Sequence, residues 1–197
     1  MTIVLASASK VRRKLLEAAG LDILVDPAAV DEAAVKESYA GEGAGPGEIA
    51  EALAELKAMR ISPRHPGLIT LGADQILDCE GQRFDKPEGL EGARAQLQAL
   101  SGRRHRLISS VVAMRDGERL WHHTGEAVLT MRKFSDGFLA GYLAAAGPAV
   151  LESVGAYQLE GRGAQLFTRI EGDYFTILGL PLLPLLAFLR SEHLLAV

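Results

Sequence analysis

The chain has 197 residues, of which 48% are hydrophobic and 23% charged, so it can bury one sizeable core and is predicted to form one domain. This composition excludes a disordered chain, a collagen and a coiled coil. The formal net charge of −4 argues against a protein that coats DNA or RNA. The single Cys79, an N-terminus without a signal-peptide pattern and the lack of an apolar run of about 20 residues predict a cytoplasmic protein with no membrane partner.

The N-terminal part is predicted to run strand, turn, helix, strand. The apolar run from Thr2 to Ala6 indicates a buried strand, and Ser9 can begin an amphipathic helix that Gly20 ends. A second strand is expected from Leu21 to Val25. The acidic segment 26–46, rich in Gly and Ala, predicts a loop and is the best candidate for a mobile segment.

A helix is predicted from Gly47 to Ile61, with Lys57 at the edge of its apolar face. The residues expected on or beside that face are Ile49, Ala52, Leu53, Leu56, Met59 and Arg60. A strand from Leu68 to Leu77 follows, and Glu80-Gly81 is typical of a hairpin turn.

The segment Asp85-Lys86-Pro87 is expected to be extended, because Pro87 disfavours helix at Lys86. The Asp116-Gly117 pair predicts a hairpin between two long strands. The other elements expected around it are a helix over 88–100, strands over 104–114 and 119–134, a helix over 135–146, short strands over 156–157, 165–170 and 174–177, and a helix over 181–190. Together they indicate one α/β domain with a mixed sheet.

Ser7 and Ser9 lie at the end of the first strand, where the following helix offers unpaired N–H groups to an anion. Four cations stand in the first turns of this helix, where they oppose its dipole unless an anion binds. They are Lys10, Arg12, Arg13 and Lys14. Polyphosphate would satisfy them all. The alternative, a serine cap followed by a solvated basic face, fits this segment equally well.

Asp74 interrupts an apolar strand, and a buried carboxylate needs hydrogen-bond donors or a metal. Taken alone, a structural role for it is the simpler interpretation. Together with Asp31-Glu32 it forms half of an oxygen-ligand site for a divalent metal. Lys57 and Lys86 are two more charges at positions where a solvated role is not obvious, although lysine side chains often extend to solvent from apolar surfaces.

Several nucleotide and metal motifs are absent from the sequence. There is no Gly-Lys pair and hence no P-loop, and the glycines of 45–50 lack the preceding strand that a dinucleotide site needs. The five histidines show no zinc-like spacing, and the pair His122-His123 is expected on the surface. The basic cluster 103–106 fits either a solvated strand start or a surface that faces an anionic partner.

Short motifs in order along nearly the whole chain resemble the Maf family. They are Leu5–Ser9, Arg12, Leu15-Leu16, Val30-Asp31-Glu32, Lys57-Ala58, Gly72-Ala73-Asp74, Asp85-Lys86-Pro87, Leu100-Ser101-Gly102, Gly155-Ala156-Tyr157, Glu160-Gly161, Glu171-Gly172 and Gly179-Leu180-Pro181-Leu182.

This resemblance implies a single domain over residues 1–197 with an inosine-triphosphatase-like fold. That fold is an elongated mixed β-sheet flanked by helices in two lobes, with a central cleft for the substrate. The implied activity is that of a nucleoside triphosphate pyrophosphatase, which converts a nucleoside triphosphate and water to the monophosphate and pyrophosphate with Mg²⁺ or Mn²⁺. The family is also associated with arrest of septum formation and includes homodimers.

The resemblance also implies roles for individual residues. Asp74 matches the general base, and Glu32 matches the acidic residue associated with metal and catalysis, so Glu32 and Asp74 would hold the metal. Lys57 and Lys86 match positions that are catalytic and bind the triphosphate. The remaining matches to triphosphate-binding positions are Ser7, Ser9 and Arg12.

Val11, Gln75 and Glu160 occupy the positions that set base preference, and all three differ from the branch selective for dTTP and UTP. Gln75 and Glu160 are similar to the branch that hydrolyses 7-methyl-GTP, and a carboxylate at Glu160 could accept the N1–H and N2–H of a guanine. We therefore expect a pyrophosphatase of modified nucleotides that favours 7-methyl-GTP. The alternatives are a broad or dTTP/UTP-type pyrophosphatase, and a nucleotide-binding regulator of septum formation without turnover.

Overall fold

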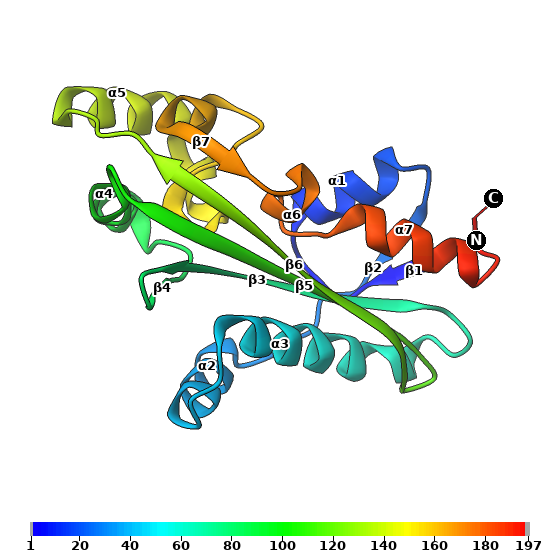
Figure 1. Ribbon diagram of the computed structural model, residues 1–197. Coiled ribbons are helices and arrows are strands. Elements are labelled where there is room, and N and C mark those ends of the chain that lie inside the picture. Colours follow the sequence, from blue (N-terminus) through cyan, green and yellow to red (C-terminus); the bar gives the residue numbers. More distant parts are fainter. Residues whose placement is uncertain (1, 196–197) are drawn as a thin grey trace. The chain divides into compact units, whose positions relative to one another are not determined.

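The computed structural model describes residues 2–195 and has a mixed α/β fold (Figure 1). Its seven-stranded sheet has the order β2-β1-β3-β5-β6-β7, and β4 pairs with β3. The strands are β1 (Thr2–Leu5), β2 (Asp22–Val25), β3 (Thr70–Cys79), β4 (Gln82–Phe84), β5 (Arg104–Arg115), β6 (Glu118–Met131) and β7 (Phe167–Glu171). The mixed α/β fold expected from the sequence is confirmed.

The helices are α1 (Lys10–Ala18), α2 (Glu32–Gly41), α3 (Pro46–Ile61), α4 (Gly89–Leu100), α5 (Asp136–Ala146), α6 (Tyr174–Ile177) and α7 (Leu182–Ser191). Four 3₁₀ turns complete the described residues: η1 (Ser62–Arg64), η2 (Gly147–Glu152), η3 (Val154–Ala156) and η4 (Arg162–Leu166). None of the helices within residues 2–195 is long and apolar enough to cross a membrane.

Strand directions place the polar residues that follow β1 beside the middle of β3. β1 runs parallel to both of its neighbours, and Leu5 is in register with Val25 of β2 and Leu71 of β3. Ser7 therefore follows β1 where Asp74 lies further along β3. β4 and β7 run antiparallel to β3 and β6, so the sheet is mixed.

The chain divides into two compact units. Unit 1 comprises residues 2–75, 108–125 and 173–195, and unit 2 comprises residues 76–107 and 126–172. β3, β5 and β6 contribute residues to both units. The single domain and the central cleft expected from the family resemblance stay predictions.

In unit 1, α1, α6 and α7 cover one side of the sheet and α3 covers the other (Figure 1). The core on the first side is apolar, and Trp121 of β6 stacks on Phe188 of α7 with 5.0 Å between ring centroids. Its buried side chains include Ile3, Leu5, Leu16, Leu71, Val111, Leu180, Leu185 and Leu189. Burial of these side chains supplies most of the stability of unit 1.

On the other side, α3 approaches β3 so closely that there is no room for a side chain at Gly72. A Cβ atom there would lie 1.9 Å from the carbonyl oxygen of Ala54 and 2.7 Å from the backbone nitrogen of Ala58. Ala54 and Ala58 are themselves fully buried, against Val112 and Met114. Three small residues thus set the distance between helix and strand.

In unit 2, His105 of β5 lies in an aromatic cluster with Tyr157 and Phe167. Its Nε2 lies 2.8 Å from the Tyr157 hydroxyl, and its buried Nδ1 has no hydrogen-bond partner. Burial lowers the pKa of His105 from 6.5 to about 4. The fold therefore favours the neutral imidazole.

Most of the local predictions are confirmed. Ser9 caps α1 by accepting from the backbone N–H of Arg12, and Ser135 caps α5 in the same way. The hairpin turn between β5 and β6 has positive φ angles at Asp116 and Gly117, as the sequence predicts. The two-residue turn at Glu80 and Gly81 likewise joins β3 to β4.

The expected loop over 26–46 is wrong for its central part, which forms α2. Asp31 caps this helix by accepting from the backbone N–H of Ala34, and the residues that follow are mostly good helix formers. The glycines that suggested a loop are confined to residues 41–47, from the last residue of α2 to the first turn of α3.

Two of the expected strands are also wrong. Residues 174–177 form α6, because Asp173 accepts a hydrogen bond from the backbone N–H of Thr176 and caps a helical turn. Residues 156–157 do not pair with the sheet. Gly155 and Ala156 have positive φ angles within a 3₁₀ turn, a conformation incompatible with an extended strand.

The apolar face expected for α3 is only partly right. Ile49 and Leu53 are buried, but Leu56 and Met59 are exposed, and Lys57 is buried rather than at an edge. The residues that face the sheet are Ile49, Ala50, Leu53, Ala54, Lys57, Ala58 and Ile61. The helix presents its small residues to β3, because only these permit the close approach at Gly72.

We expect the substitution Gly72→Ala to lower the free energy of unfolding by about 2 kcal/mol or more, because the added methyl group collides with the backbone of α3. Urea denaturation measures this loss. Gly41→Ala in α2 is the matched control, since nothing lies within 4 Å of a Cβ there, and it should leave stability unchanged or slightly raised. Equal effects of the two substitutions would contradict the close approach.

We expect His105 to make stability dependent on pH. Its pKa is about 4 in the fold and about 6.5 in the unfolded chain, so its contribution is complete above pH 6.5 and is lost as the pH falls toward 4. The fall amounts to about 3 kcal/mol. The variant His105→Gln should lack this component when urea unfolding is compared at pH 7 and pH 4. An unchanged pH dependence in the variant would show that other groups cause it.

Candidate active site

The site in unit 1 begins with a buried ion pair between β3 and α3. Asp74 of β3 is 5% exposed and Lys57 of α3 is 7% exposed. The Lys57 Nζ donates to Asp74 Oδ1 at 2.7 Å. The close approach at Gly72, two residues before Asp74 on the same face of the strand, brings the lysine within reach of this carboxylate.

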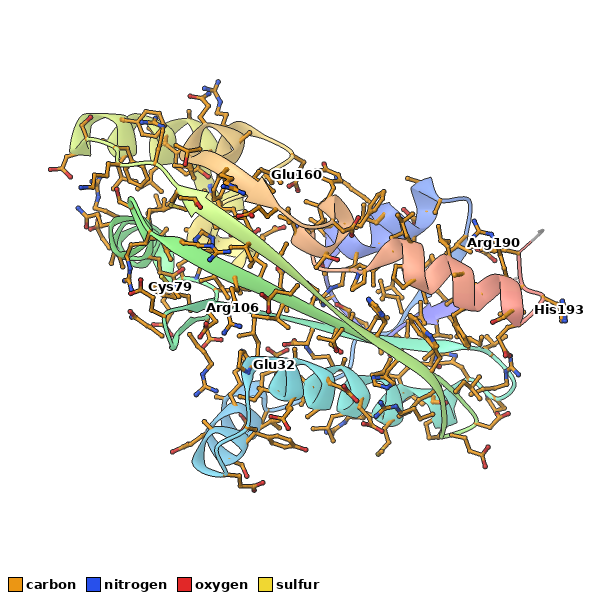
Figure 2. The ribbon with its side chains drawn as sticks, viewed as in Figure 1. Glu32, Cys79, Arg106, Glu160, Arg190 and His193 are labelled. Carbon is orange, nitrogen blue, oxygen red and sulfur yellow. The ribbon has the colours of Figure 1, made fainter. Side chains whose placement is uncertain are left out.

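Glu32 adds a second carboxylate to the same lysine. It is the first residue of α2, which lies beside α3 (Figure 2), and its Oε1 lies 2.6 Å from the Lys57 Nζ. Its side chain is 44% exposed, so this end of the cluster faces solvent while the Asp74 end is buried. One ammonium group thus joins two carboxylates from different elements, and the trio has a net charge of −1.

One oxygen of Asp74 has no partner. Its Oδ1 accepts from Lys57, but its Oδ2 is buried and receives no hydrogen bond. Leaving such an atom without a partner costs about 1–3 kcal/mol, so an unsatisfied buried oxygen needs an explanation. A free, fixed carboxylate oxygen can accept a proton from water or bind a cation.

Among the four cations in the first turns of α1, only Arg12 is buried. Its guanidinium is buried and donates from Nε to the Gly179 carbonyl at 2.8 Å, and from Nη1 to the Ala73 carbonyl at 2.7 Å and to Ser7 Oγ at 3.1 Å. Burial lowers the pKa of Arg12, and the charges of Asp74 and Glu32 act in the opposite direction.

The other cations of this helix are exposed at its surface. Arg13 pairs with Glu17, and Lys10 and Lys14 are exposed, which fits the alternative of a solvated basic face. Ser9 Oγ serves as the helix cap. The anion site at the N-terminus of α1 stays a prediction.

The side-chain amide of Gln75 is held by hydrogen bonds to other residues of unit 1. Its Nε2 lies 3.0 Å from Ser109 Oγ of β5, 3.2 Å from the Thr176 carbonyl and 3.0 Å from the Ile177 carbonyl of α6. Ser109 Oγ in turn donates to the Thr176 carbonyl at 2.8 Å. Val11, the neighbour of Arg12 on α1, is half-buried.

Lys86 and Glu160 belong to unit 2, so their part in the site stays a prediction. Lys86 is exposed at a bend in the irregular segment between β4 and α4. Glu160 is exposed in the turn before η4 (Figure 2).

Two groups of polar residues were missed in the sequence. Ser109 and the α6 carbonyls, which bind Gln75, carry no motif that marks them. In unit 2, Arg106 (Figure 2) donates to the buried Asp78 at 2.8 Å. The alternation of β3 places Asp78 on the same face as Asp74, and this spacing could have marked it. The anions that meet the basic cluster 103–106 thus include carboxylates of this chain.

The residues present fit a divalent metal that is completed by its substrate. Within residues 2–195 no three His, Cys, Asp or Glu side chains form a ligand group. Mg²⁺ usually keeps waters and binds one or two carboxylates plus substrate phosphates, which requires no larger protein cage. Glu32 and Asp74 offer two carboxylates, one of them with the unpartnered oxygen.

We expect Lys57→Met to lower the free energy of unfolding by about 3–5 kcal/mol, because it leaves the Asp74 carboxylate buried without a partner. The double variant Lys57→Met/Asp74→Leu should recover most of this loss, since it removes the stranded charge as well. Urea denaturation compares the two. A loss below about 1 kcal/mol in the single variant would show that Asp74 is solvated rather than buried.

The sequence of the chain was compared with known proteins and protein families. The family model for the Maf-like protein matches residues 2–192. A protein named nucleoside triphosphate pyrophosphatase from Paramagnetospirillum magneticum is 62% identical over 96% of this chain and 97% of its own length. One named 7-methyl-GTP pyrophosphatase from Mesorhizobium japonicum is 52% identical over 96% and 95%.

A solved structure of a nucleoside-triphosphatase / dITP/XTP pyrophosphatase from Mycobacterium abscessus is similar over 98% of this chain and 96% of that chain, with a TM-score of 0.43 and 15% identity. The family model covers all of the unit 1 residues that surround Asp74. The chain belongs to the Maf family.

Proposed function

We propose that this protein is a nucleoside triphosphate pyrophosphatase that uses the cluster of Asp74, Lys57 and Glu32. The observation that carries the proposal is the buried, unpartnered Oδ2 of Asp74 beside a lysine that fixes the other oxygen. The names of relatives at 62% and 57% identity, both nucleoside triphosphate pyrophosphatases, support the same activity.

In the proposed reaction Asp74 is the general base. Lys57 holds Oδ1, so Oδ2 is free to accept a proton from a water molecule as its oxygen attacks the α-phosphorus. The bond between the α-phosphorus and the oxygen that leads to the β-phosphorus breaks, and pyrophosphate leaves with that oxygen. The products are the nucleoside monophosphate and pyrophosphate.

Glu32 and Asp74 are the residues that would hold Mg²⁺ or Mn²⁺. The metal, when bound, neutralises charge on the phosphates and supports the departure of pyrophosphate. Lys57 keeps the two carboxylates close together despite their repulsion, because its ammonium contacts both at 2.6 and 2.7 Å. The same residue therefore assembles the ligands and orients the base.

The triphosphate is proposed to bind at Ser7, Ser9 and the N-terminus of α1. Ser7 Oγ accepts from Arg12 and can still donate to a phosphate oxygen. Arg12 acts mainly by holding Ser7 and the Ala73 carbonyl in place, because three of its donors already bind protein oxygens.

For the base we propose a preference for 7-methyl-GTP over dTTP. Curated relatives at 49–52% identity are named 7-methyl-GTP pyrophosphatase. The exposed carboxylate of Glu160 can accept the two donors of a guanine edge, which a pyrimidine lacks. An unchanged base preference in Glu160→Gln would count against this assignment. The cytoplasmic location and the homodimer stay predictions.

The decisive measurement is pyrophosphate release from 7-methyl-GTP, GTP, ITP, dTTP and UTP with Mg²⁺. We expect Asp74→Asn to lower kcat by about 10²–10⁴-fold, because the amide cannot accept the proton. Asp136→Asn, at an exposed position of α5, is the matched control and should keep full activity. Nucleotide binding without release by the wild-type protein would overturn the proposal and favour the non-catalytic regulator.

A further inference from the structure

Side chains from three other elements of unit 1 donate hydrogen bonds to the backbone of residues 174–181, which comprise α6 and its connection to α7 and are here called the α6–α7 link. Its carbonyl oxygens accept from Arg12 of α1 at Gly179, from Gln75 of β3 at Thr176 and Ile177, and from Ser109 of β5 at Thr176. Backbone carbonyls that bind side-chain donors in this way have a fixed position relative to those side chains.

The amide hydrogens of Gln75 are fully used by this arrangement. The Ser109 hydroxyl donates to the Thr176 carbonyl, so its oxygen can accept one hydrogen of the Gln75 amide, and the Ile177 carbonyl accepts the other. No amide hydrogen then remains for a nucleotide base. The orientation of the amide is set by acceptors on the protein side.

The same network holds both residues that flank Asp74. On one side the Ala73 carbonyl accepts from Arg12 at 2.7 Å, and on the other Gln75 binds α6 and β5. Side chains alternate along a strand, so Gln75 lies on the face opposite to Asp74. The carboxylate is thus anchored to Lys57 on one face, while its neighbours in the chain are anchored on the other.

Gly179 allows the backbone of the α6–α7 link to approach the side chains of Arg12 and Gln75. Its φ angle is +92°, and a Cβ atom there would lie 3.5 Å from the Arg12 guanidinium and 3.6 Å from Gln75 Oε1. The backbone of the link therefore passes directly beside both side chains. The two donors act on one short segment rather than on separate parts of the fold.

We propose that Gln75 is a positioning residue that fixes Asp74 through the α6–α7 link, rather than a residue that reads the nucleotide base. The inference rests on the proposed pyrophosphatase function. Without the amide, the Ile177 carbonyl and the Ser109 hydroxyl oxygen lose a donor, and β3 loses its attachment at the residue after Asp74. Asp74 Oδ2 is then held less accurately against the attacking water, and a misplacement of about 1 Å is costly in rate.

The test is steady-state kinetics of Gln75→Leu and Gln75→Glu with 7-methyl-GTP and dTTP. Both variants remove the donor, and the glutamate keeps the size and the acceptor. We expect kcat to fall by about 10- to 100-fold for both nucleotides in both variants. KM and the ratio of kcat/KM between the nucleotides should stay within about twofold. Gln82→Leu, at an exposed position of β4, is the control and should change neither.

A double-mutant cycle with Ser109→Ala tests the route of the effect. Ser109 accepts a hydrogen bond from Gln75 and donates one to the Thr176 carbonyl, so Ser109→Ala should also lower kcat. The double variant should lose less than the product of the two single losses. Two outcomes would overturn the proposal. One is that the losses of kcat in the two single variants are independent. The other is that kcat is retained in the Gln75 variants while the ratio of kcat/KM between 7-methyl-GTP and dTTP changes by more than about tenfold, which would make Gln75 a base-reading residue.

Amide hydrogen exchange tests the link without turnover. The N–H groups of Leu178, Gly179 and Leu180 bond to carbonyls of residues 174–176, within the link. We expect them to exchange about tenfold faster in Gln75→Leu than in the wild-type protein. Unchanged exchange overturns the proposal. A wild-type protein that releases no pyrophosphate would overturn the proposed function instead, and this exchange result would still decide whether Gln75 holds the link.

Discussion

The close approach of α3 to β3 is the constraint on which the site depends. Gly72 leaves no space for a side chain between strand and helix, and Ala54 and Ala58 provide the matching surface on α3. At this distance a lysine one turn along the helix reaches a carboxylate two residues along the strand. The ion pair between Lys57 and Asp74 is therefore a result of packing, and its geometry is as rigid as the core that surrounds it.

Strand β3 uses its two faces for different tasks around Asp74. On one face Asp74 binds Lys57, which also contacts Glu32, and on the other face Gln75 binds the α6–α7 link. The backbone around Asp74 is thus held by side-chain contacts on both faces of the strand. This division also explains why an acidic residue is tolerated within an otherwise apolar strand.

Much of the fold could be predicted because it depends on local signals. Capping serines, the Asp116-Gly117 turn and apolar runs mark the elements that the structure confirms. The prediction failed for α2 because nearby glycines dominated the composition of its segment, and for the face of α3 because its small residues were not treated as a packing surface.

The site was partly predictable for a related reason. Asp74 and Lys57 are charges in apolar surroundings, and such charges are conspicuous in a sequence. The carbonyl acceptors of Thr176, Ile177 and Gly179 are not, because every residue has one and only the fold decides which are used. A serine such as Ser109 is equally common in strands and loops and acquires its role only through its neighbours.

Helix α2 has no fully buried residue, and Glu32 at its first turn bonds to the buried Lys57. Its contacts with the rest of unit 1 thus combine this ion pair with half-buried side chains. The energy of an ion pair at a partly exposed position depends on ionic strength and on the charges beside it. A change in the charge around Lys57 therefore changes the energy of the contact that Glu32 makes for α2.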